Sequence, residues 1–141
     1  MYNLDGIFYE MLRLSRIYII VMIIFLMSSK FWNKKKRKTK DLVMSLVCIL
    51  LTIGTIMYYS YVIRNPNIAV HEGFFMEEHR ERNSVTRWEY VFSNDGGLKP
   101  IFSLDVSSKK NIYPEDFDTK NKYRIYFEER TNIIVKVELI E

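Results

Sequence analysis

A dense basic run between two apolar stretches constrains this chain more than any other feature. The run comprises Lys34, Lys35, Lys36, Arg37, Lys38 and Lys40. The apolar stretch after it, Leu42–Ile63, has 22 residues without a charged side chain. An α-helix needs about 20 apolar residues to cross the hydrocarbon core of a bilayer. We therefore expect a transmembrane helix over 42–63, which ends where Asn65 and Pro66 break the helical pattern.

The apolar stretch before the basic run is shorter. Ile17–Ser29 has 13 uncharged residues between Arg16 and Lys30, so spanning requires apolar flanks and basic side chains that reach toward the head groups. We expect a second transmembrane helix over about 12–32. An interfacial or re-entrant segment is the alternative. A cleaved signal peptide is disfavoured, because no small-residue cleavage site follows and the basic run opposes export of what comes after it.

The basic run also predicts the orientation of these helices, because short loops rich in Lys and Arg stay on the cytoplasmic side. The loop Lys30–Lys40 has seven such residues, whereas the N-terminal tail has two. Residues 1–64 are therefore predicted to form a multi-pass anchor in the cell membrane, with both termini outside and the basic run facing lipid head groups. Residues 65–141 are predicted to form an extracytoplasmic domain.

The charge of the chain is unevenly divided. Through Arg64, ten Lys and Arg stand against three acids, and from Asn65 onward eleven stand against fourteen. A nucleic-acid-binding protein concentrates positive charge on its folded domain. The mildly acidic second half therefore argues against a nucleic-acid partner, although salt-sensitive binding of single strands by the β domain would reverse that interpretation.

After Pro66 the sequence changes to short runs with period-two alternation, which is typical of a sheet with one wet face. Five strands are expected, at 68–78, 88–92, 99–105, 123–128 and 133–140. Asn94–Gly97 predicts a tight hairpin turn. The segment 112–117 predicts one helical turn with Pro114 at its first position, whose rings Tyr113 and Phe117 would cover one end of the core.

The core of this domain must be rich in aromatic residues. Cys48 is the only cysteine, so no internal disulfide can stabilise so small a domain. The residues expected to supply most of the buried surface are Trp88, Tyr90, Phe92, Phe102, Tyr123 and Phe127. Alternation places Val135, Val137 and Leu139 on one face of the last strand, and it places Val91 and Glu128 on the face opposite the core.

The order of three strands, a helical turn and two strands is that of the OB-fold. The segments that show this pattern are Trp88–Phe92, the turn at Asp95–Gly96, Phe102–Asp105, Lys122–Phe127 and Ile133–Ile140. They resemble small secreted or membrane-tethered OB-type proteins of Gram-positive bacteria, the YxeA-like group among them, over about the last 70 residues. The resemblance implies a small five-stranded OB-like β-barrel outside the cytoplasm, and it implies no established activity. The two-helix anchor differs from the single leader of those proteins.

The sequence offers little for catalysis or metal binding. His71 and His79 are the only histidines, and a straight strand would separate them by about 26 Å, so we expect surface side chains rather than a metal site. No serine lies in a nucleophile elbow, no glycine-rich phosphate loop is present, and the acids near Asp116 lack the spacing of a calcium loop. We expect no metal, no cofactor and no enzymatic activity.

Two mixed charge runs are candidates for contact with a partner. They contribute Glu77, Glu78, Arg80 and Arg82 near the first β–β loop, and Glu129 and Arg130 in the last hairpin; small OB barrels bind ligands at these loops. We expect a non-catalytic module that binds an envelope or secretion component at the outer face of the membrane. An immunity protein against a bacteriocin or secreted toxin is the alternative. The sequence is compatible with a homo-oligomer.

Overall fold

A computed structural model describes the chain except residues 32–34, 81–86, 94–99, 106–108, 110–111, 114–115 and 141, and except the side chains of residues 28–31 and 35–38. The described residues form two compact units. A β unit contains Asn65–Glu141 together with Met1–Ile7, and a helical unit contains Phe8–Arg64. The first seven residues therefore belong with the C-terminal half, whereas the sequence placed all of residues 1–64 in one anchor.

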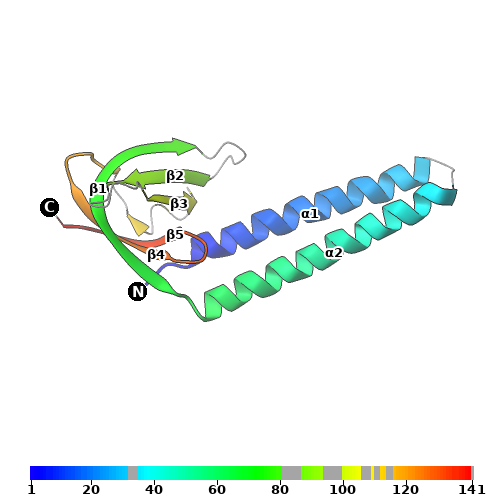
Figure 1. Ribbon diagram of the computed structural model, residues 1–141, viewed down its shortest axis with the longest axis horizontal. Coiled ribbons are helices and arrows are strands. Elements are labelled where there is room, and N and C mark those ends of the chain that lie inside the picture. Colours follow the sequence, from blue (N-terminus) through cyan, green and yellow to red (C-terminus); the bar gives the residue numbers. More distant parts are fainter. Residues whose placement is uncertain are drawn as a thin grey trace. The chain divides into compact units, whose positions relative to one another are not determined.

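The helical unit consists of two long helices, α1 (Asp5–Phe31) and α2 (Lys35–Arg64), which lie side by side and antiparallel (Figure 1). Both begin earlier than the spans at 12–32 and 42–63. Among the described residues, one helical segment is long and apolar enough to cross a membrane, Thr39–Arg64, with a mean hydropathy of 2.1. The expectation of two transmembrane helices is thus supported for α2 only. The charges of Glu10, Arg13 and Arg16 interrupt the apolar part of α1.

One face of α2 is less exposed than the others. Its residues recur at alternating spacings of four and three, as in a helix-packing seam: Asp41, Ser45, Cys48, Thr52, Thr55, Tyr59 and Val62. Small and hydroxyl-bearing side chains allow the close approach of a second helix in an apolar environment. Two of the hydroxyls are satisfied within the helix, since Ser45 donates to the Asp41 carbonyl and Thr52 to the Cys48 carbonyl, both at 2.8 Å.

The β unit is a five-stranded sheet that closes into a ring. Its strands are β1 (Ile68–Arg80), β2 (Arg87–Phe92), β3 (Ile101–Asp105), β4 (Lys122–Glu128) and β5 (Ile133–Leu139). The order around the ring is β1-β2-β3-β5-β4, and β1 pairs first with β4 and then with β2. The β3–β5 contact closes the ring at Ser103 and Ile133. All five predicted strands are confirmed, with small differences at their ends.

The core of the β unit is aromatic, as predicted. Tyr90, Phe92, Phe102 and Tyr123 are buried, while Trp88 and Phe127 pack against them and are partly buried. Ile125, which alternation placed on the same face as Tyr123, is also in the core, and so are residues that the alternation did not single out, among them Phe75, Leu104 and Ile134. Phe117 lies at one side of this cluster, and its ring centroid is 5.1–5.6 Å from those of Phe75, Tyr90, Phe92, Tyr113 and Tyr123.

The helical turn after β3 lies earlier than predicted. The Tyr113 N–H donates to the Lys109 carbonyl at 2.8 Å, so the turn ends before Pro114 rather than beginning with it. Asp116 and Phe117 are not helical, while Pro114 itself lies outside the described residues. A helix stops readily at the residue before proline, because the proline ring clashes with the preceding backbone. Phe117 still reaches the core by stacking on Tyr113.

The exposure expected from alternation is wrong at three positions. Val91 and Glu128 are buried although alternation placed them on the wet face, and Leu139 is half-exposed although alternation placed it with Val137. The β4–β5 register shifts where Tyr126 pairs with Lys136 and Phe127 pairs with Ile134; the extra residue is Val135 on β5, which brings Ile134 into the core together with Val137. The predicted hairpin turn at Asn94–Gly97 lies outside the described residues.

Candidate functional site

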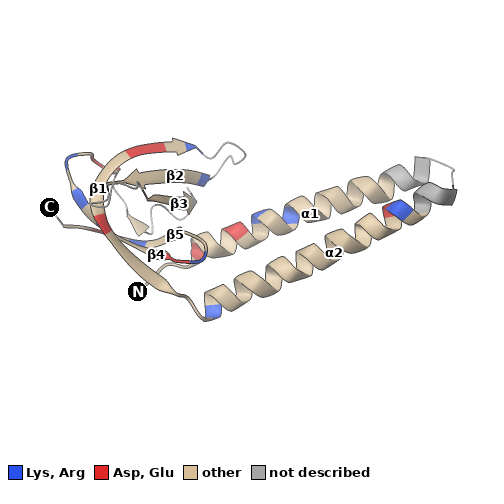
Figure 2. Cartoon of the chain, viewed as in Figure 1, with Lys and Arg blue, Asp and Glu red and all other residues tan. Residues whose placement is uncertain are grey.

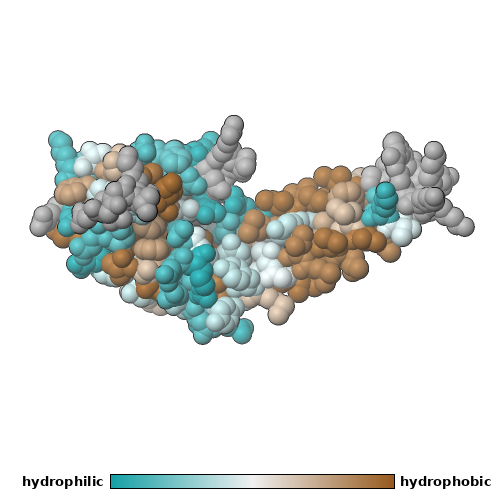
Figure 3. Space-filling model, in the orientation of Figure 1, coloured by the Kyte–Doolittle hydropathy of each residue, from teal (hydrophilic) through white to brown (hydrophobic). Residues whose placement is uncertain are grey.

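Charged residues are sparse along the apolar middle of both helices and more frequent on the β unit (Figure 2). The helical unit instead exposes apolar side chains over much of its length (Figure 3). Lys40 is exposed near the start of α2. The remaining basic-run positions, namely Lys34 and the side chains of Lys35, Lys36, Arg37 and Lys38, lie outside the described part of the chain. The candidate sites are therefore considered on the β unit.

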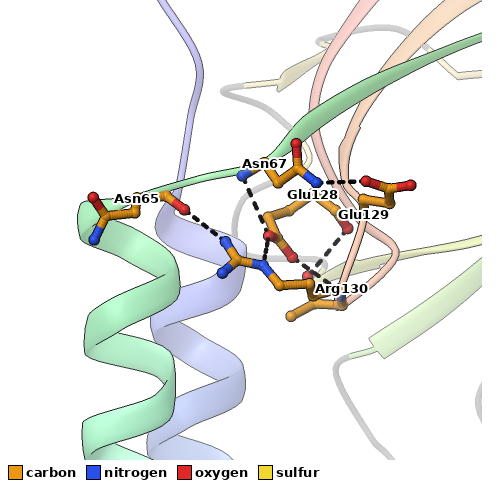
Figure 4. Close-up of polar contacts among 6 residues, drawn as sticks. Asn65, Asn67, Glu128, Glu129 and Arg130 are labelled. Carbon is orange, nitrogen blue, oxygen red and sulfur yellow. Dashed lines mark hydrogen bonds and ion pairs between the residues drawn. The ribbon is translucent and has the colours of Figure 1, made fainter.

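The first site is a buried carboxylate at the end of β4. Glu128 is fully buried, and it accepts a hydrogen bond from Arg130 Nε at 2.6 Å and another from the Thr131 N–H at 3.0 Å (Figure 4). The Asn67 N–H is a third donor, at 3.4 Å. A buried charge is tolerated only when it is paired and hydrogen-bonded, and these donors meet that need.

The same cluster binds the linker that follows α2 to the last hairpin. Arg130 Nη2 donates to the Asn65 carbonyl at 2.6 Å, and Asn67 Nδ2 donates to Glu129 Oε2 at 2.5 Å. The Glu129 N–H returns a bond to the Asn67 carbonyl at 2.9 Å. Two residues predicted to contact a partner, Glu129 and Arg130, are thus engaged inside the chain (Figure 4).

The other predicted contact residues lie at the far end of β1. Glu77, Glu78 and Arg80 are exposed and pair with Val91, Tyr90 and Trp88 of β2. Arg82 lies outside the described residues. The last hairpin, by contrast, adjoins the first residue of β1, since Ile68 pairs with Glu128. The structure therefore places the two predicted groups beside opposite ends of one strand.

An exposed apolar patch, which sequence reasoning missed, lies next to Glu77. Phe74, Met76 and Ile101 are 45%, 40% and 49% exposed. Phe74 and Met76 precede Glu77 on β1. Strand pairing places Ile101 in the same row of residues as Glu77, because Glu77 pairs with Val91 and Val91 pairs with Ile101. A register shift between Phe75 and Glu77 disrupts the alternation that would have indicated this face, which we call the apolar patch.

The two histidines lie in different surroundings on the β unit. Among the described residues, no group of three or more His, Cys, Asp or Glu is arranged to hold a metal ion. His71 is half-buried rather than solvated as expected, with Nε2 2.8 Å from the Ser93 carbonyl oxygen and its ring 5.6 Å from that of Phe102. His79 is exposed and pairs with Glu89 at 2.8 Å.

The N-terminal residues, which belong to the β unit, contact β4 and β5. The Asn3 N–H donates to the Val135 carbonyl of β5 at 2.9 Å, and the rings of Tyr2 and Tyr126 are 5.7 Å apart. Lys136 Nζ lies 5.2 Å from the centre of the Tyr126 ring. Comparison of the chain with protein-family models, curated proteins and solved structures finds no match.

Proposed function

We propose that this chain is a membrane-anchored, non-catalytic binding protein whose β unit stands on the outer side of the cell membrane. The observation on which the anchor depends is the apolar surface of α2, where Leu50 and Met57 are 61% and 68% exposed. Soluble proteins rarely expose a continuous apolar surface of this length to water. Lipid tails would cover it.

In this proposal both helices cross the membrane. The chain is bound to the same β unit just before α1 and just after α2, since Asn3 bonds to Val135 and Asn65 bonds to Arg130. If α2 crosses, the chain can return to that unit only when α1 crosses as well. Exposed apolar side chains between Ile17 and Met27 of α1 support this route. The basic run then lies in the cytoplasm, according to the positive-inside rule.

The ring of strands is best interpreted as a small OB-like barrel. The order β1-β2-β3-β5-β4, with β1 shared between β4 and β2, supports this interpretation, as does the helical turn between β3 and β4. The resemblance to YxeA-like proteins covers the same residues and implies the same location outside the cytoplasm. Small barrels of this class serve many functions, so the fold alone does not identify one.

The apolar patch is the surface that best fits a protein partner. Stable interfaces combine an apolar centre with a polar rim, and Phe74, Met76 and Ile101 lie beside the acidic residues Glu77 and Glu78. We infer that the partner is a protein component of the envelope or of a secretion system, with apolar side chains flanked by basic ones. Glu129 and Arg130 support the linker and do not contact this partner.

Labelling of single cysteines tests the sidedness. In a Cys48→Ser background, a membrane-impermeant maleimide added to intact cells should label Asp95→Cys and leave Lys36→Cys unlabelled until the cells are opened. If only Lys36→Cys is labelled in intact cells, the protein has the opposite orientation in the membrane. A chain that remains in solution without detergent would overturn the anchor.

Two matched substitutions test the binding surface. Ile101→Asp places a charge in the apolar patch. Leu139→Asp places the same charge at a similarly exposed residue outside the patch, on β5. A partner crosslinked to the full chain in membranes should be lost with Ile101→Asp and kept with Leu139→Asp. Equal loss or equal retention would reject the patch. If Ile101→Asp cells become sensitive to a bacteriocin while no membrane complex changes, the protein acts in protection rather than assembly.

A further inference from the structure

We propose that α1 becomes a transmembrane helix only because its N-terminal segment, Met1–Ile7, is bound by the β unit. The β unit would then complete the topology of the anchor that carries it. This inference rests on the proposed membrane anchor, and it concerns how that anchor is established.

The composition of α1 does not by itself account for a crossing. Its 27 residues would extend about 40 Å, which exceeds the roughly 30 Å of the hydrocarbon core, so length is sufficient. Charge is the obstacle, because Glu10, Arg13 and Arg16 occupy its first half. Among the described residues, α2 alone satisfies the length and hydropathy required for a span. Insertion of α2 alone would leave the N-terminus on the cytoplasmic side with the basic run.

The contacts made by Met1–Ile7 supply what α1 lacks. The Asn3 N–H donates to the Val135 carbonyl at 2.9 Å, and the Tyr2 ring packs 5.7 Å from the Tyr126 ring. Ile7, the last residue of the segment, is fully buried. Withdrawal of the segment to the other side of the membrane would break these contacts.

The residues that bind Met1–Ile7 lie on β5 and on the neighbouring strand β4. The one residue pair between β3 and β5 in the described chain is Ser103 with Ile133, and the Val135 carbonyl beyond it receives Asn3. Tyr126 is held in place by its hydroxyl, which donates to Glu138 Oε2 at 2.9 Å. Lys136 bonds to the other oxygen of Glu138 and lies over the Tyr126 ring. The Tyr2 contact is therefore made to a ring whose position is fixed.

The order of synthesis gives this arrangement a consequence. Val135 and Lys136 belong to β5, so the N-terminal segment can bind there only after β1 to β4 have been synthesised. In the proposed route, α2 inserts first, the β unit folds outside, and capture of Met1–Ile7 then holds α1 across the membrane.

Two pairs of substitutions in the full chain test this proposal. Asn3→Pro removes both the asparagine side chain and the N–H that bonds to Val135. Asn3→Ala removes the side chain but keeps the N–H. Tyr126→Ala removes the ring that packs on Tyr2, and Tyr126→Phe keeps it. The reporter is Asp5→Cys, in a Cys48→Ser background, labelled on intact cells with a membrane-impermeant maleimide. Asp95→Cys, in separate samples, reports the side of the β unit.

We expect Asn3→Ala to label at Asp5→Cys as the parent does, and Tyr126→Phe, which keeps the ring but loses its bond to Glu138, to label between the parent and Tyr126→Ala. Asn3→Pro and Tyr126→Ala should each lower the ratio of labelled to protected reporter about two- to tenfold, the range expected for loss of one hydrogen bond or one ring pair. Asp95→Cys should label equally throughout. Asn3→Pro lies outside every strand, so it tests the proposal even if Tyr126→Ala unfolds the β unit.

The possible outcomes separate this inference from the one on which it rests. If the two reporters label on opposite sides in the parent, the two-crossing anchor is wrong. If they label on the same side in the parent and in all four variants, the anchor stands and the dependence of α1 on the β unit is rejected.

Discussion

Gly73 lies directly against the carbonyl group of Ser93, at the point where β1 leaves β4 and joins β2. β1 pairs with β4 as far as Phe74 and with β2 from Phe75 onward. A Cβ atom on Gly73 would overlap the Ser93 carbonyl oxygen. The same serine is tied to β1 by its N–H, which donates to the Phe74 carbonyl at 2.9 Å. The bend of β1, and with it the closure of the ring, depends on this close approach.

Gly73→Ala should therefore destabilise the β unit by about 1–3 kcal/mol, because backbone atoms must move to admit the methyl group. Unfolding of the full chain in detergent by urea, followed by tryptophan fluorescence, would measure the loss. Gly54→Ala is the matched control, since nothing lies within 4 Å of a Cβ there and alanine favours the helix. Equal midpoints for Gly73→Ala and the parent would contradict the role assigned to this glycine.

Phe92→Ala should cost more stability than Trp88→Ala, although tryptophan is the larger residue. Phe92 is fully buried in the aromatic cluster, whereas Trp88 is partly exposed at its border. Deletion of a fully buried phenylalanine ring typically costs about 3–5 kcal/mol. Resistance of the full chain to proteolysis over a urea series would rank the two variants without relying on the Trp88 signal. The reverse ranking would show that the core is centred nearer to Trp88.

Arg130→Gln should destabilise the β unit by about 3 kcal/mol, because it leaves the buried Glu128 carboxylate without its ion pair. The double variant Glu128→Gln/Arg130→Gln should recover part of that loss, since no buried charge then remains. Arg124→Gln removes an exposed ion pair with Glu72 and should cost much less than Arg130→Gln, because water screens exposed pairs. Thermal unfolding of the four chains gives the comparison. Similar losses for Arg130→Gln and Arg124→Gln would show that the Glu128 cluster is not a stabilising centre.

Glu138 should contribute to a loss of stability in acid. Hydrogen bonds from Lys136 and then from Tyr126 hold the pKa of its carboxyl below the usual 4.5. A depressed folded-state pKa means that the contribution is present above pH 4.5 and is lost as the pH falls through the folded-state value. NMR titration of the Glu138 side-chain carbon should show the pKa rising in Lys136→Met and rising less in Tyr126→Phe. An unchanged pKa in Lys136→Met would reject this cause.

Several features were predictable because they depend on neighbouring residues along the chain. The strands at 88–92, 123–128 and 133–140 follow from period-two alternation, and α2 follows from 22 consecutive uncharged residues. The aromatic core was predictable for the same reason, because Trp88, Tyr90 and Phe92 recur at every second position of one strand. Local patterns failed where a bulge intervened on β5, since the extra residue at Val135 brings Ile134 into the core together with Val137.

The candidate site was less accessible to sequence reasoning. Glu129 and Arg130 were predicted to face a partner, yet they bind Asn65 and Asn67, more than 60 positions earlier. No local pattern records a contact between residues so far apart. The apolar patch was missed because its members come from β1 and β3, which become neighbours only through β2.

The sequence by itself determined the two-part organisation of this protein, because hydropathy and alternation are properties of adjacent residues. Only the tertiary structure decided which residues belong to which part. It placed Met1–Ile7 in the β unit, enclosed Glu128 and brought Gly73 against Ser93. Each of these depends on segments that are distant in the chain and meet when the ring of strands closes, and the free energy of such contacts has no signature in local composition.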